Sequence, residues 1–176
     1  MRADGPDTAG LPSLPVPPGG QVLGVGMDLV DVPALAAQLA QPGTVLAERA
    51  FTPRECREAR RRSQESGSQE AEHLAARWAA KEAFVKAWSQ AVNTLAGTGV
   101  VPALSPQELD WREIEVVSDH WHRPGLRLAG RVAQTVSATL GPGGTASARW
   151  LVSLTHDGGW AAAVVLALAS GSEQET

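Results

Sequence analysis

Residues 73–88, HLAARWAAKEAFVKAW, decide how this chain folds and where its chemistry can lie. Their pattern predicts a helix with two different halves, because successive residues turn by about 100° around an α-helix. One half is rich in alanine and would pack closely against a neighbouring element, which would hold the opposite, charged half rigidly, as an active site requires. The charged half consists of Arg77, Trp78, Lys81, Glu82, Val85, Lys86 and Trp88, and it contains both lysines of the chain.

The composition is that of one ordinary globular domain, with 43% hydrophobic and 19% charged residues in a chain of 176. A net charge of −4 argues against a general nucleic-acid binder. No apolar run approaches the roughly 20 residues that span a bilayer, so we expect no membrane contact. The single cysteine, Cys56, excludes an internal disulfide and a cysteine-based metal cluster. It fits a reducing compartment, which predicts a cytoplasmic protein.

The two ends of the chain differ from the rest. Residues 1–20 hold five of the twelve prolines and four glycines, which predicts a disordered extension. Residues 170–176 resemble a short frayed acidic tail. The folded domain is therefore expected to cover residues 21–169.

Strand and helix patterns alternate along this domain. Helices are expected from Asp31 to Pro42-Gly43, from the capping box Thr52-Pro53-x-Glu55 to about Arg62, over 73–88 and over 130–140, with connections at 63–71 and 91–110. Strands are expected at 21–30, 112–118, 125–128, 147–155 and 160–168, with a hairpin turn at 156–159. This order predicts an α+β domain with a mainly antiparallel sheet packed against a long central helix. Strand 160–168 has almost no polar alternation, which indicates burial on both faces.

The charged residues of the central helix, with one residue of the first strand, allow two interpretations. Asp28 follows an apolar run, where it would either cap the next helix or bind a metal. Glu82 and Lys86 are four residues apart, the usual spacing of an exposed helix ion pair, but they share their face with tryptophans. Arg77 and Lys81 would repel each other mildly at the same spacing unless an anion such as phosphate lay between them.

The hairpin near the C-terminus adds hydrogen-bonding groups. Ser153 and Thr155 alternate along a strand and His156 follows them, which favours a binding site over a merely exposed histidine. Gly24 and Gly26 resemble the start of a dinucleotide fingerprint, but the third glycine is missing, so we exclude that motif. Carboxylates, cations, hydroxyls and a histidine together suit Mg²⁺ with a polyphosphate. Zinc clusters and the Walker-type glycine loop are absent from the sequence.

Four blocks of sequence together resemble a known family. In chain order they are GVGMDLV (24–30), FTPRE (51–55), RWAAKEAFVKAW (77–88) and SLTHDGGWAAAVV (153–165). This combination is similar to the holo-acyl carrier protein synthases, the small phosphopantetheinyl transferases. The stretch AQPGTV (40–45) is most similar to the actinobacterial branch.

The resemblance implies a 4′-phosphopantetheinyl transferase fold, a homotrimer with each site between neighbouring subunits, and a reaction. In that reaction 4′-phosphopantetheine passes from coenzyme A to a serine of an acyl carrier protein, either a free protein or a domain of a synthase, in fatty acid or polyketide synthesis. It further implies Mg²⁺ on Asp28 and Glu82, with Glu82 and Lys86 as catalytic residues. The implied coenzyme A contacts are Arg77, Lys81, Lys86, Ser153, Thr155 and His156.

This chain departs from the family in the helix after Asp28. Many relatives dock the acidic carrier on basic residues there, but residues 33–40 contain no lysine or arginine. Arginines lie in the next helix instead, and we expect Arg54, Arg57 and Arg61 either to meet the carrier or to form a solvated face.

Two other functions compete with that of a transferase. One is a non-catalytic coenzyme A or nucleotide-binding module of the same fold, and the other is a structural interaction domain.

Overall fold

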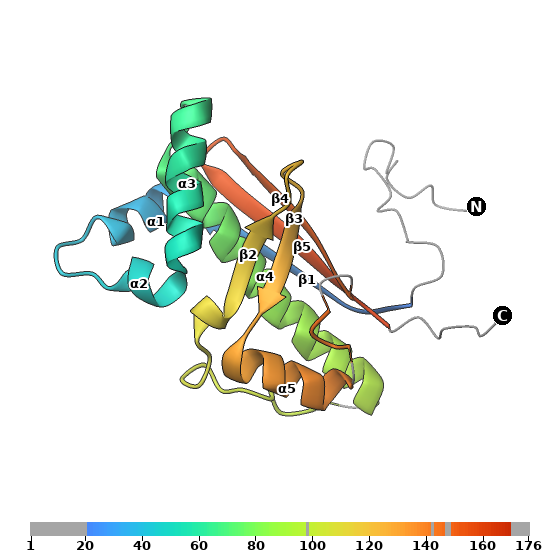
Figure 1. The fold of residues 1–176 in the computed structure, drawn as a ribbon. Helices are drawn as coiled ribbons and strands as arrows, with labels where there is room; N and C mark the ends of the chain where they lie inside the picture. Colours follow the sequence, from blue (N-terminus) through green and yellow to red (C-terminus); the bar gives the residue numbers. More distant parts are fainter. Residues whose placement is uncertain (1–20, 98, 142, 147–148, 170–176) are drawn as a thin grey trace, which may run out of the picture.

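A computed structural model describes residues 21–97, 99–141, 143–146 and 149–169 of the chain. Helix α4, Glu70–Ala96, runs through the middle of the molecule, with α1, α2 and α3 at one end and α5 beside the other (Figure 1). The other elements are, in chain order, β1 Val22–Asp31, α1 Val32–Leu39, α2 Leu46–Ala50, α3 Pro53–Ser66, the 3₁₀ turn η1 Trp111–Glu113, β2 Ile114–Ser118, β3 Pro124–Leu128, α5 Gly130–Leu140, β4 Trp150–Asp157 and β5 Trp160–Leu168. The predicted extension 1–20 and tail 170–176 lie outside the described residues.

The strands form two antiparallel sheets, which confirms the α+β prediction. One sheet has three strands in the order β1-β5-β4, and the other is the hairpin β2-β3. Helix α4 packs on one face of the three-stranded sheet, which we call the inner face. Within the described ranges, no helix combines the length and the apolar character that a membrane span requires.

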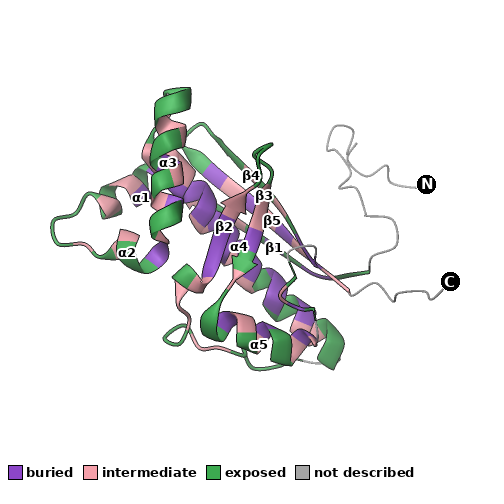
Figure 2. Cartoon of the chain, in the orientation of Figure 1, coloured by how far each residue is buried: buried purple, intermediate pink, exposed green. Residues whose placement is uncertain are grey.

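Two glycines of β1 allow α4 to approach the inner face very closely. A Cβ atom on Gly26 would lie 1.9 Å from the carbonyl oxygen of Ala83, and one on Gly24 would lie 2.3 Å from that of Ala87. Both alanines are fully buried, and Figure 2 shows long stretches of α4 in the colour of buried residues. The glycines of the rejected nucleotide motif therefore serve backbone-to-backbone packing, in which any side chain would clash.

The opposite face of the three-stranded sheet, the outer face, is apolar and partly exposed. Its large side chains are 40% to 58% exposed on β1 and β4. They are Val25, Met27 and Leu29 of β1 and Leu151 of β4, with Ala162, Val164 and Leu166 of β5 between them. In the single chain α4 buries the inner face of 160–168 and the outer face is half-buried, so burial of both faces stays a prediction for the assembled protein.

Two of the four predicted helix starts are confirmed by side-chain caps. Thr52 Oγ1 accepts a hydrogen bond from the Glu55 amide at 3.2 Å, and Glu55 Oε2 accepts one from the Thr52 amide at 2.8 Å, so the capping box opens α3. Asp31 Oδ1 accepts from the Ala34 amide at 2.8 Å and caps α1. Asp31 thus takes the capping role that was one interpretation of Asp28.

The helix ends differ from the prediction. Helix α3 continues to Ser66 and α4 to Ala96, so both predicted connections, 63–71 and 91–110, are shorter than expected. Polar residues near these ends do not stop a helix as glycine does. Each helix ends at the first glycine that follows it, Gly67 or Gly97, and both adopt the left-handed conformation.

Candidate active site and nucleotide cleft

Asp28, Glu82 and Lys86 gather where β1 crosses α4. Asp28 follows Gly26 on the inner face, so the close packing of strand and helix brings it against the charged side of α4. The Lys86 ammonium lies 2.8 Å from Asp28 Oδ1 and donates to the Met27 carbonyl at 3.0 Å. The helix ion pair suggested by the Glu82–Lys86 spacing is thus replaced by a contact between helix and strand.

The negative charges of the two carboxylates at this site repel each other, which disfavours the ionised form of Glu82. Partial burial raises the pKa of Glu82, and the nearby charge of Asp28 raises it further, while Lys86 lowers it less. One ammonium therefore does not fully compensate two carboxylates. The arrangement has room, electrostatically, for one more positive charge.

This donor set fits Mg²⁺ better than a metal held wholly by protein. In the described part of the chain, no group of three or more His, Cys, Asp or Glu side chains is placed to hold a metal ion. Magnesium commonly takes one or two carboxylates and completes its shell with water and phosphate oxygens. Asp28 and Glu82 could supply these carboxylates.

A second feature is a basic cleft of about 300 Å³ beside the N-terminal half of α4. Its polar lining residues are Arg62, His73, Arg77, Ser118, His122 and His156, without an acidic residue among them. Arg77 is only 7% exposed, and burial lowers its pKa. Its Nη1 donates to the His73 carbonyl at 2.9 Å, but its Nε is buried without a hydrogen-bond partner among the described residues. A mostly buried guanidinium at a cleft lined by a second arginine and by no carboxylate is a candidate site for an anion.

His156 lies in this cleft among groups that set its environment. The His73 ring meets it edge-on at 5.2 Å between centroids, and Glu72 Oε2 lies 3.3 Å from its Nδ1. Burial, with the nearby His156 and Arg77, lowers the pKa of His73. The structure therefore brings together Arg77 and His156, two of the predicted coenzyme A contacts.

Ser153 and Thr155 do not share this cleft. They pair with Val164 and Ala162 of β5 and lie on the outer face, whereas His156 lies on the inner face. Successive side chains of a strand point to opposite sides, so one chain alone does not bring these hydroxyls and His156 to one ligand. Within the single chain these hydroxyls and His156 lie on opposite faces of the sheet, and their contact with coenzyme A stays a prediction.

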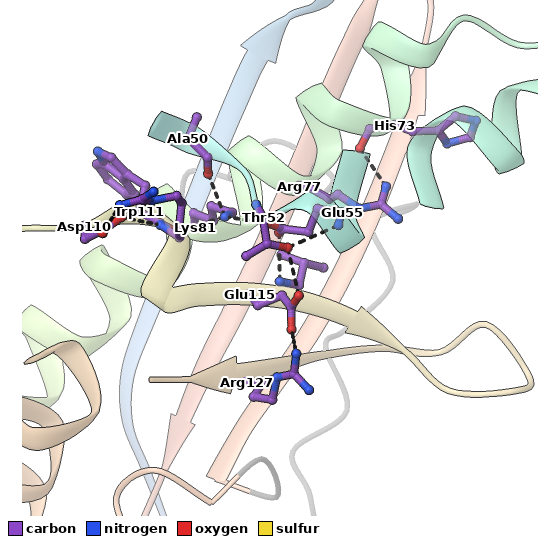
Figure 3. A network of polar contacts seen from close by, with 12 residues as sticks. Ala50, Thr52, Glu55, His73, Arg77, Lys81, Asp110, Trp111, Glu115 and Arg127 are labelled. Atoms are coloured by element: carbon purple, nitrogen blue, oxygen red, sulfur yellow. Dashed lines mark hydrogen bonds and ion pairs between the residues drawn. The ribbon is translucent and has the colours of Figure 1, made fainter. Parts of the chain in front are cut away.

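Lys81 also differs from the prediction, because it is a structural residue. Its side chain has no exposed surface, and its ammonium donates to the Ala50 carbonyl at 2.7 Å and to Glu55 Oε2 and the Trp111 carbonyl, both at 2.9 Å (Figure 3). Glu55 is equally buried and also accepts from the Val116 amide at 3.0 Å. A ligand would reach Lys81 only by breaking these bonds, so Lys81 is not placed to contact coenzyme A.

The arginines of α3 are unequal. Arg61 pairs with Glu58 at 2.7 Å and Glu65 at 2.6 Å. Arg54 and Arg57 are exposed and form no ion pair with any other residue that the structure describes. These two are therefore the arginines whose charge is available to a partner.

Several cleft residues were missed from the sequence. His73 is four residues before Arg77, so helix periodicity would have placed it on the same face. Arg62 and His122 come from α3 and from the turn between β2 and β3, and only the folded chain brings them to α4. Their positions carry no local signal in the sequence.

Known proteins resemble this chain over most of its length. A family model described as the 4′-phosphopantetheinyl transferase superfamily matches residues 24–165. The holo-[acyl-carrier-protein] synthase of Mycobacterium tuberculosis is 47% identical over 145 residues, covering 82% of this chain and 95% of the relative. That of Corynebacterium glutamicum is 42% identical over 142 residues, covering 81% and 95%.

A solved structure gives the same result for the fold. The Chronobacterium ammoniagenes ACPS–CoA complex superposes with a TM-score of 0.68 at 41% identity, covering 83% of this chain and 96% of the other. The family resemblance seen in the four sequence blocks is thus confirmed. The chain belongs to the 4′-phosphopantetheinyl transferase superfamily, in the group of the holo-[acyl-carrier-protein] synthases.

Proposed function

We propose that this protein transfers 4′-phosphopantetheine from coenzyme A to a serine of an apo-acyl carrier protein, releasing adenosine 3′,5′-bisphosphate. The observation that carries the proposal is the pairing of two sites on one helix, the carboxylate–lysine group and the basic cleft around Arg77. The five positions from Arg77 to Glu82 rise about 7.5 Å along the helix axis, a distance that one nucleotide can span. In this proposal, one ligand with two separated phosphate groups occupies both sites.

The roles of the residues follow from their charges. Asp28 and Glu82 would hold Mg²⁺, which when bound neutralises charge on the pyrophosphate oxygens. Lys86 would stabilise the negative charge that develops as the bond between the two phosphates breaks. Arg77 and His156 would bind the nucleotide part of coenzyme A.

The transfer step needs a group to take the proton of the attacking serine. The serine oxygen forms a bond to the phosphorus of the pantetheine phosphate, and the bond to the bisphosphate oxygen breaks. Glu82, whose raised pKa suits a proton acceptor, would receive the proton directly or through a water that it orients.

The carrier would dock on α3 in this proposal. Its Arg54 and Arg57 are exposed without ion pairs to other described residues, whereas α1 contains no basic residue. Arg61 would contribute less, because Glu58 and Glu65 already pair with it. Replacing Arg54 and Arg57 by Glu should raise the carrier KM at low salt without changing the KM for coenzyme A. An unchanged carrier KM would remove α3 as the docking surface.

The apolar outer face supports assembly into a homotrimer. Exposed Val25, Met27 and Leu29 would be covered by neighbouring copies, which recovers apolar burial that the single chain lacks. Ser153 and Thr155 lie on this same face. Their predicted contact with coenzyme A then requires a site shared between neighbouring subunits of the cytoplasmic enzyme.

One assay separates the candidate functions. The protein is incubated with coenzyme A, Mg²⁺ and an apo-carrier, and the carrier mass is followed for the addition of phosphopantetheine. Binding of coenzyme A without transfer would select the non-catalytic module, and no binding would select the interaction domain. Glu82→Gln should abolish transfer, whereas Glu70→Gln, on the same helix but paired with Arg60, should not.

A further inference from the structure

The turn between β2 and β3 contains an unusual backbone conformation. His122 has φ of 68°, and no other non-glycine residue in the described part of the chain has a positive φ. Side chains with a Cβ atom disfavour this region, so residues that adopt it are held there by their surroundings. Such conformations are frequent at ligand sites, which makes the turn a candidate for a specific role.

Asp119 holds the turn in this conformation. Its Oδ1 accepts hydrogen bonds from the amides of Trp121 and Arg123, both at 2.9 Å, and its Oδ2 lies 2.6 Å from Arg123 Nε. The His122 amide donates to the Asp119 carbonyl at 2.9 Å. The side chain and the carbonyl of one residue thus hold the backbone of three successive residues, so the backbone from which the His122 side chain projects is set before any ligand arrives.

His122 projects from this held backbone into the lining of the basic cleft. It lines the cleft opposite α4, together with Arg62 of α3 and with Arg77 and His156. His73 of α4 also lines the cleft. Glu72 is not among the lining residues, but its carboxylate lies 3.3 Å from Nδ1 of His156, which is. His122 therefore adds a hydrogen-bond donor from a fourth direction to an anion site that contains no lining carboxylate.

We propose that His122 is a further binding residue, which recognises the 3′-phosphate of coenzyme A, and that Asp119 is its positioning residue. The inference rests on the proposed function. The pyrophosphate belongs beside Lys86 and the carboxylates, so the anion left for the cleft is the phosphate at the other end of the nucleotide. His122 then makes the enzyme prefer coenzyme A over 3′-dephospho-coenzyme A.

The test compares these two substrates in His122→Gly, because glycine keeps the positive φ and removes only the imidazole. The KM for coenzyme A should rise about tenfold, and the preference over dephospho-coenzyme A should fall by the same factor, the effect of losing one charge-assisted hydrogen bond. The affinity for adenosine 3′,5′-bisphosphate, measured by calorimetry, should fall equally. Asp119→Ala should lower the preference in the same direction.

His120→Ala is the matched control, because His120 lies in the same turn but lines the neighbouring groove and not the cleft. It should leave the preference unchanged. An unchanged preference in His122→Gly, an equal loss for both substrates, or the same loss in His120→Ala would each overturn the inference. If the wild-type protein itself neither binds coenzyme A nor modifies a carrier, the proposed function fails instead.

Discussion

Replacing Lys81 by Met should destabilise the protein severely, although the substitution keeps the length and the apolar stem of the side chain. The thioether would leave the Glu55 carboxylate buried without its cation, and the Ala50 and Trp111 carbonyls without their donor. Removing one partner of a buried ion pair costs about 3–5 kcal/mol, because the other charge remains desolvated.

Urea unfolding followed by circular dichroism measures this loss. With an m value of about 2 kcal/mol/M, the midpoint should fall by about 2 M. The chain offers a matched control in its other lysine, since the Lys86 side chain is 50% exposed in its pair with Asp28. Lys86→Met should change stability by less than about 1 kcal/mol and should abolish transfer instead.

The two lysine variants should therefore differ both in stability and in activity. If the urea midpoint of Lys81→Met fell by less than about 0.5 M, as expected for Lys86→Met, the assignment of Lys81 as a buried structural cation would be refuted.

Three further substitutions test other parts of the structure. Gly26→Ala places a Cβ atom against the Ala83 carbonyl and should cost about 3 kcal/mol in thermal or urea unfolding, with Asp28→Ala as a control that adds no atom. Glu82→Gln should stabilise the metal-free protein at neutral pH by about 0.5–1 kcal/mol. This gain in the free energy of unfolding should vanish below pH 4.5, because a carboxyl whose pKa is raised by folding weakens the fold only at pH values where it is ionised. A gain that stayed constant with pH would contradict this reasoning. Met27→Glu on the outer face should reduce the assembled fraction in light scattering, and an unchanged mass would exclude this face as the subunit contact.

Local signals in the sequence predicted the starts of elements well. The Thr52–Glu55 capping box and the Asp31-x-Pro33 start are formed by neighbouring residues, so the sequence contains both partners. The hairpin between β4 and β5 and the placement of Asp28 beside Glu82 and Lys86 were also expected. The last of these depended on family resemblance, because strand and helix are distant in the sequence.

The direction of side chains on α4 was not predictable in the same way. The sequence divides the helix into an alanine half that packs and a charged half that was expected to form the site, and Arg77, Lys81 and Trp88 were placed on the charged half. All three are buried, because α3, η1 and α5 cover parts of the helix that the sheet leaves open. Tertiary contacts of this kind determine which charged residue meets a ligand and which one meets a buried partner.

The close contact of β1 with α4 also determines how this site can vary. Since main-chain atoms set the separation of Asp28 and Glu82, truncating nearby core side chains should leave that separation almost unchanged. Any added carbon atom at Gly24 or Gly26 pushes the two elements apart. A saturation-mutagenesis library should therefore show the two glycines depleted of every substitution, while the larger residues around them tolerate smaller ones.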